Sequence, residues 1–114
     1  MSAVALKERL RADLKSAIQA KVVSEVRLLR TLIAALDNAE AVPVAHDKYV
    51  SRKFGDPGGE VPRLSLDGEA IAHVLAAEIE ARLVAAMDYD RHGEAAEATR
   101  LRAEAGLIER YTAA

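Results

Sequence analysis

The sequence predicts an all-α fold in which two antiparallel helical hairpins pack as a small bundle. Of the 114 residues, 51% are hydrophobic and only 4% are aromatic, and alanine and leucine, both strong helix formers, dominate the apolar set. Apolar residues also recur every three or four positions along most of the chain, which is typical of amphipathic helices. Because a chain of this length holds one core, we expect a single domain over residues 1–114.

The first hairpin is predicted from helices over about 3–20 and 24–41. The first range carries one apolar stripe, whereas Leu28 makes the stripe of the second range wide enough to contact two neighbours. The residues between the ranges include neither glycine nor proline, so the periodicity also permits one continuous helix. The two stripes contain Leu6, Leu10, Leu14, Ala17 and Ile18, followed by Val26, Leu29, Leu32, Ile33, Leu36 and Ala39.

A long connector is predicted over 42–66, where the helical period disappears. All three prolines of the chain lie in this range. Since proline disrupts a helix interior, Pro43 predicts that the second helix ends by about Val42. Within the connector, 48–53 and 60–64 flank a glycine-rich turn, a pattern that predicts either a short β-hairpin or a mobile loop.

The second hairpin is predicted from helices over about 67–92 and 94–111. Ser65 or Asp67 can cap the first of them, because both side chains accept hydrogen bonds from a helix start. Gly93 can supply the left-handed residue that follows its end. Small residues on the predicted packed faces allow the helices to approach closely. These residues are Ala17, Ala34, Ala35, Ala76 and Ala86.

Charge is distributed unevenly along the chain. The net charge is −2, but residues 1–42 carry seven basic and five acidic side chains, and residues 68–114 carry five and nine. Any contact with nucleic acid should therefore lie near the N-terminus. A solvated helix face is the alternative interpretation of this pattern. The candidate phosphate-binding residues are Lys7, Arg11, Lys15, Arg27 and Arg30.

Few residues suggest chemistry. The chain has no cysteine, which excludes a thiol nucleophile, and His46, His73 and His92 are scattered. Two of these histidines follow a carboxylate by four residues, a spacing that is commoner for surface helix pairs than for metal ligands. We interpret Glu78 and Arg82 as a structural ion pair, with a binding role as the alternative. We expect no catalytic residue, no metal site and no cofactor.

The N-terminal region does not resemble a targeting segment. Charged residues begin at Lys7 without a following apolar stretch of the kind found in secretory signals. No uncharged run reaches the length of a membrane span. We therefore expect a cytoplasmic protein that does not interact with membranes.

Five segments of the chain, distributed from residue 6 to residue 111, share a pattern: they are 6–15, 28–40, 75–82, 90–93 and 103–111. In order and spacing these segments resemble the GatB/YqeY family. The resemblance implies a YqeY-like helical module without its own active site, accessory to tRNA or to a tRNA-dependent amidotransferase. The family-level term is carbon–nitrogen ligase activity with glutamine as amido-N-donor. The family usually continues into a helical tail domain that contacts tRNA, which we expect to be absent here.

The alternative function is a protein–protein interaction or self-association module with no nucleic-acid role. Without a tail domain, the end of the last helix should expose Leu107, Ile108 and Tyr111. An exposed apolar patch of this kind often marks a partner surface. The sequence thus predicts tRNA, a protein partner or a second copy of the chain as the binding partner.

Overall fold

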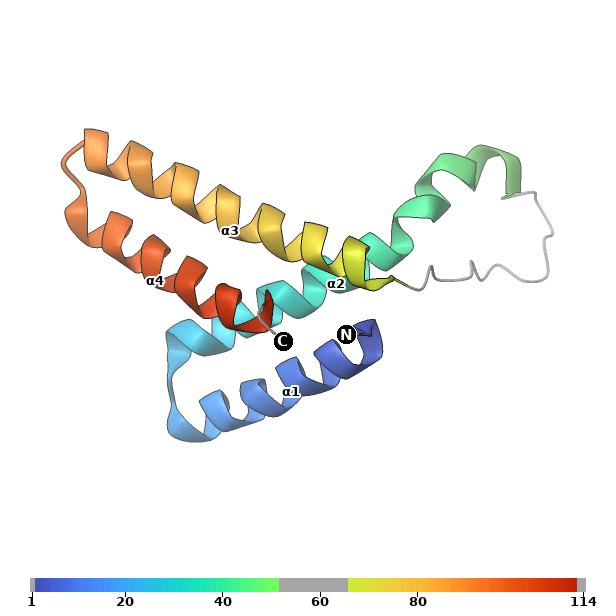
Figure 1. Cartoon of the computed structure of the whole chain (residues 1–114), viewed down its shortest axis with the longest axis horizontal. Coiled ribbons are helices and arrows are strands. Elements are labelled where there is room, and N and C mark those ends of the chain that lie inside the picture. The colour runs from blue at the N-terminus through green and yellow to red at the C-terminus, as the bar shows by residue number, and fades with distance from the viewer. Residues whose placement is uncertain (1, 52–65, 113–114) are drawn as a thin grey trace.

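The computed structural model describes the backbone of residues 2–51 and 66–112, and the side chains of 2–41 and 66–112. The described residues form helices and no strands, which confirms the predicted fold class. Figure 1 shows α1 and α2 as one hairpin and α3 and α4 as a second one that crosses it. The helices are α1 (Ala3–Ala20), α2 (Val23–Ser51), α3 (Gly68–Arg91) and α4 (Ala95–Thr112).

Side-chain caps fix the starts of α1 and α3. The Ser2 hydroxyl accepts a hydrogen bond from the Ala5 N–H at 3.0 Å. Of the two candidate caps for α3, Asp67 performs this role, since its Oδ1 accepts from the Ala70 N–H at 2.8 Å. Both bonds satisfy backbone donors that a helix start leaves without an intrahelical partner. After α3 the chain turns at Gly93, which has φ +75°, as predicted.

The chain breaks between α1 and α2, so one continuous helix is excluded. Lys21 adopts the left-handed conformation, with φ 60° and ψ 35°. The Lys21 N–H donates to the Ile18 carbonyl at 3.1 Å, and the Val22 N–H donates to the Ala17 carbonyl at 3.0 Å. This pair of bonds is a Schellman ending, in which glycine usually takes the left-handed position. Because lysine takes it here, the sequence carries no clear signal for the turn.

The second helix is longer than predicted. It continues through Pro43 to Ser51, so the prediction of an end near Val42 is wrong. A proline removes one backbone donor, but no glycine follows it before Gly55, and the turns from Pro43 to Ser51 stay helical. The predicted strand at 48–53 therefore begins inside α2, and the rest of the predicted β-hairpin lies outside the described residues.

Two clusters of buried side chains lie along the hairpins. The larger cluster is rich in leucine and joins all four helices. The smaller one joins the outer halves of α3 and α4 and consists of Ala86, Ala98 and Leu101. The largest fully buried side chains belong to the first cluster, and they are Leu6, Leu10, Leu29, Leu32, Leu36, Leu75 and Ile108.

Not every alanine predicted at a packed face is buried. Ala17 and Ala86 are 3% and 0% exposed, in agreement with close helix packing. Ala34 and Ala76 are exposed, so the packing prediction is wrong for these two. The apolar residues of these two helices cover a wide part of the helix surface. The α-helical period therefore does not show which of them are packed and which face solvent.

The helices of the described part of the chain are amphipathic. None of them is both long enough and apolar enough to cross a bilayer. Most of their buried apolar side chains belong to the two clusters between the helices, whereas Leu83, Val84 and Met87 of α3 are exposed.

Candidate nucleic-acid interface

Lys7, the first of the predicted phosphate-binding residues, lies inside the α1–α2 hairpin. Its side chain is 12% exposed, its Nζ lies 2.8 Å from Asp37 Oδ1, and it also contacts Glu40 Oε1. Burial disfavours the charged amine, but the hydrogen bonds to both carboxylates and their attraction outweigh this effect and raise the Lys7 pKa. Lys7 therefore joins α1 to α2, and the prediction that it is available to phosphate is wrong.

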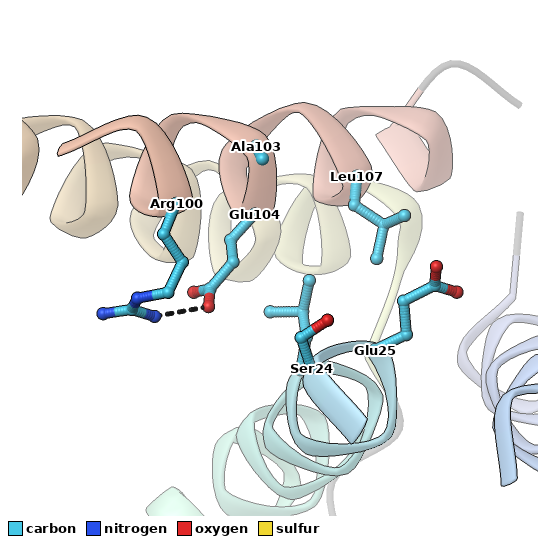
Figure 2. A pocket seen from close by; sticks show the side chains of 7 residues that line it. Ser24, Glu25, Arg100, Ala103, Glu104 and Leu107 are labelled. Atoms are coloured by element: carbon cyan, nitrogen blue, oxygen red, sulfur yellow. Dashed lines mark hydrogen bonds and ion pairs between the residues drawn. The ribbon is translucent and has the colours of Figure 1, made fainter. Parts of the chain in front are cut away.

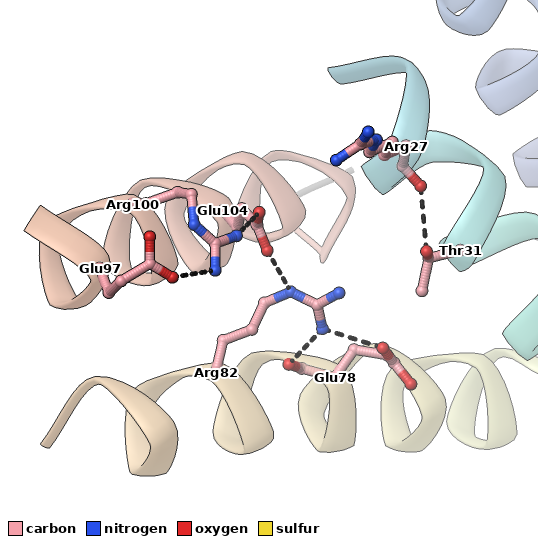
Figure 3. Close-up of polar contacts among 7 residues, drawn as sticks. All are labelled: Arg27, Thr31, Glu78, Arg82, Glu97, Arg100 and Glu104. Atoms are coloured by element: carbon pink, nitrogen blue, oxygen red, sulfur yellow. Dashed lines mark hydrogen bonds and ion pairs between the residues drawn. The ribbon is translucent and has the colours of Figure 1, made fainter. Parts of the chain in front are cut away.

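The other four predicted cations remain at the surface. Arg11 and Lys15 lie one turn apart on α1, and Arg27 and Arg30 lie on the outer side of α2, all of them exposed. The ion pairs found between described residues include none of these four. Cations without a carboxylate partner can neutralise phosphates at little cost. Figure 3 shows the Arg27 guanidinium extended away from α2, while its carbonyl accepts a hydrogen bond from Thr31.

The predicted partner surface at the end of α4 is largely buried. Ile108 is 0% exposed and Tyr111 is 5% exposed, so the expectation of an exposed patch is wrong for both. The Tyr111 hydroxyl donates to Asp13 Oδ2 at 2.5 Å, and the Arg9 guanidinium lies 4.6 Å from the centre of the tyrosine ring. Burial, together with Asp13, raises the pKa of Tyr111 far above its ordinary value. These contacts attach the end of α4 to α1.

Arg9 and Asp13 are residues that the sequence pattern alone does not single out. They lie one turn apart on α1, on the side of that helix that faces α4. The Arg9 Nη2 also donates to the Arg110 carbonyl at 3.5 Å. The available signal was their i, i+4 spacing, but it becomes informative only once the position of α4 is known.

Leu107, the third residue of the predicted surface, is half-buried. Figure 2 shows it pointing from α4 toward α2, opposite Ser24 and Glu25. It contributes to the wall of an open pocket of about 200 Å³ between these helices. The lining residues are Ser24, Glu25, Leu28, Arg100, Ala103, Glu104 and Leu107. The pocket has one hydroxyl and an apolar floor, and its lining supplies no histidine or lysine to activate that hydroxyl.

The predicted pair of Glu78 and Arg82 is part of a larger ionic network (Figure 3). Arg82 Nη1 lies 2.9 Å from Glu78 Oε1, and Arg82 Nε lies 3.0 Å from Glu104 Oε1. Arg100 then bridges Glu104 at 2.7 Å and Glu97 at 2.9 Å, and this contact lowers the pKa of Glu97. The Arg82 side chain is 14% exposed. The network thus joins α3 to α4 beside the small alanine-rich cluster. Both of its arginines are paired with carboxylates.

The histidine patterns do not form a metal centre in the described part of the chain. No group of three or more histidine, aspartate or glutamate side chains there could hold an ion. At the turn after α3, His92 Nδ1 lies 2.7 Å from the carbonyl oxygen of Asp88. The Asp88 carboxylate instead pairs with Arg91 at 3.1 Å. The i, i+4 spacing of Asp88 and His92 therefore reflects the end of a helix.

No protein-family model matches the chain, and no curated protein matches it. The similarity to the GatB/YqeY family therefore stays a prediction that depends on the sequence segments.

Proposed function

We propose that this chain is a non-catalytic, YqeY-like helical module that binds structured RNA as an accessory to tRNA or to tRNA-dependent amidotransferase. The observation that carries the proposal is the set of four exposed cations on α1 and α2. Each lies outside the ion pairs between described residues. A phosphate backbone is the polyanion that such a set can neutralise, with release of its counterions. The four are Arg11, Lys15, Arg27 and Arg30.

Four of the five arginines of the other hairpin support this location by contrast. Arg82, Arg91, Arg100 and Arg102 each contact at least one carboxylate. Phosphate binding there would compete with these carboxylates, most strongly at the partly buried Arg82, and carboxylates outnumber cations on α3 and α4. RNA is therefore expected to approach the α1–α2 hairpin.

The non-catalytic part of the proposal is supported by the residues around the two pockets that contain a serine. In the α2–α4 pocket the one hydroxyl, Ser24, lies among carboxylates, an arginine and apolar groups. In the neighbouring pocket between α1, α2 and α4, Ser16 lies among lining residues that include Asp13 and Glu25. A serine nucleophile needs an adjacent base of suitable pKa and a third group that orients it. Neither lining provides this arrangement.

The proposal predicts the salt dependence of tRNA binding. If the four cations contact about four phosphates, the plot of log affinity against log salt concentration should have a slope near −3.6 on duplex regions, from about −0.9 per contact. Affinity at physiological salt should lie in the non-specific range of about 10⁻⁴ to 10⁻⁶ M. Fluorescence anisotropy with bulk tRNA at several salt concentrations measures both quantities.

A matched pair of double variants locates the interface. The double variant Arg11→Gln, Lys15→Gln should lose about two phosphate contacts, which makes the slope shallower by about 1.8. Arg100→Gln with Arg102→Gln removes the same charge from arginines that are already paired, and should leave the slope unchanged. Absence of binding at low salt contradicts the RNA proposal, and equal effects of the two double variants contradict the assigned surface.

The alternative of a protein-interaction module without a nucleic-acid role was predicted for the end of α4. Ile108 and Tyr111 are buried against the rest of the protein, so we do not propose this end of the chain as its surface. The exposed apolar side chains of α3 are better suited to self-association.

A further inference from the structure

Three large apolar side chains are exposed together on α3. Leu83, Val84 and Met87 are 41%, 52% and 54% exposed. They fall within five residues of one helix: Val84 points away from the buried Ala86, and Leu83 and Met87 lie between these two directions. Single exposed apolar residues are common on protein surfaces, whereas a contiguous group suggests an interface.

The described helices leave this side of α3 uncovered. Figure 1 shows α3 along one edge of the molecule, with α4 running beside it on the other side. The contacts of α3 with α4 involve a different side of the helix, where Ala86 packs in the small cluster and Arg82 reaches Glu104. The patch is therefore open to a molecule that approaches from outside.

Opposite charges flank the patch at equal distances. Glu80 lies one turn before Val84, and Arg91 lies one turn after Met87. The Arg91 side chain is 68% exposed, and its contact with Asp88 is an ion pair in which both side chains face solvent. Such a pair contributes little to stability. Arg91 can therefore turn to another carboxylate without a large penalty.

This arrangement is complementary to itself. When two α3 helices run antiparallel about a two-fold axis between positions 85 and 86, Val84 lies opposite Met87 of the second copy. The same axis places Glu80 opposite Arg91 of the second copy. In such an isologous contact every pair occurs twice. A single two-fold rotation thus brings the apolar side chains of the two copies together and places each charge opposite one of the other sign.

We propose that the chain forms a homodimer through the outer side of α3, with Leu83, Val84 and Met87 at its centre and Glu80 paired with Arg91 of the second copy. The self-complementary charges favour a second copy over an unrelated partner. The inference does not depend on the proposed RNA binding, which involves the other hairpin. One helix pair is smaller than a standard interface of about 1,600 Å². The dimer is therefore expected to be weak, with a dissociation constant of micromolar order or higher.

Sedimentation equilibrium from about 10 µM to 1 mM tests for the dimer over the range that a weak interface requires. The native chain should shift from monomer to dimer across this range. Met87→Glu should weaken dimerisation about tenfold or more, because it buries a charge in the centre of the interface. Val4→Glu is the control, since Val4 is also an exposed apolar residue but lies on α1. A chain that remains monomeric throughout, or that responds equally to both substitutions, overturns the proposal.

A charge exchange tests the antiparallel register. Glu80→Arg alone and Arg91→Glu alone each place like charges opposite one another and should weaken the dimer. The double variant restores opposite charges and the original net charge, so its dimerisation should return toward that of the native chain. Circular dichroism at each concentration checks that the helices are retained. A double variant no better than the single ones overturns the proposed pairing.

Discussion

The two hairpins of this molecule are held together by different side chains. Between α1 and α2, leucines fill the interior, and Leu10, Leu32 and Leu36 are completely buried. In the outer halves of α3 and α4, the interior is formed by Ala86 and Ala98 with one leucine at its side. A leucine interior obtains its stability from buried volume, whereas an alanine interior obtains it from close approach of the helix backbones.

The two hairpins also differ in how their charged side chains are paired. Among the described residues up to position 41, Lys7 is the cation that forms ion pairs, and Arg11, Lys15, Arg27 and Arg30 project into solvent. On α3 and α4, four of the five arginines contact carboxylates. Where helices approach through small residues, long charged side chains can reach across the boundary and pair. The hairpin with the larger apolar core leaves its cations available for a ligand.

The largest expected effect is the loss of a leucine from the α1–α2 interior. Leu32→Ala removes a side chain that is 0% exposed, and should destabilise the fold by about 2–5 kcal/mol through lost burial and a residual cavity. Leu101→Ala makes the same change in the small cluster, where the side chain is 9% exposed. We expect this second variant to cost less, because nearby solvent limits the cavity. Urea denaturation of both variants measures the difference, and equal losses would remove the contrast between the two interiors.

A smaller effect is expected from enlarging the alanine interior. Ala86→Leu adds volume at a position that is 0% exposed and in the same cluster as Ala98, and should cost about 1–3 kcal/mol by overpacking. Ala76→Leu places the same side chain at an exposed position of α3, and should change stability by less than about 0.5 kcal/mol. Thermal and denaturant unfolding of the pair tests the expectation. A neutral Ala86→Leu would show that α3 and α4 are not closely packed there.

The parts of the fold that were predictable from sequence are those with local signals. Asp67 and Gly93 lie beside the ends of α3, and each acts on the backbone within a few residues of itself. The break at Lys21 has no such signal, because a lysine occupies a position where glycine is usual. At Pro43 the local signal was misleading, since the turns that follow it remain helical.

The candidate site was predictable only in part, because contacts between residues far apart in the sequence decide which cations can bind a ligand. Lys7 and Arg11 are equivalent in the sequence pattern, yet Lys7 meets Asp37 and Arg11 faces solvent. The spacing of Glu78 and Arg82 predicts their contact, since both lie on one helix. The third partner, Glu104, comes from another helix. Periodicity along one helix does not show which residues of a second helix lie beside it.

The smallest predicted effect concerns the contact that joins the two hairpins at the end of α4. Tyr111→Phe keeps the ring beside Arg9 and removes the hydroxyl that donates to Asp13. The lost hydrogen bond should cost about 1 kcal/mol near neutral pH. Tyr89→Phe is the control, since Tyr89 is 38% exposed, and its replacement should have less effect on urea denaturation.

The pH dependence identifies the source of this effect. Burial and Asp13 raise the folded-state pKa of Tyr111 above the value near 10 of an unfolded chain. Tyr111 therefore contributes its full stabilisation below about pH 10 and loses it as the pH rises further, because only the unfolded chain ionises readily there. Lys7 has a raised pKa as well, but it is present in both proteins and its contribution cancels in their difference. The stability advantage of the native chain over Tyr111→Phe should thus shrink between about pH 10 and 11. A difference that stays constant over this range would show that the tyrosine hydroxyl is not shielded at the junction of the hairpins.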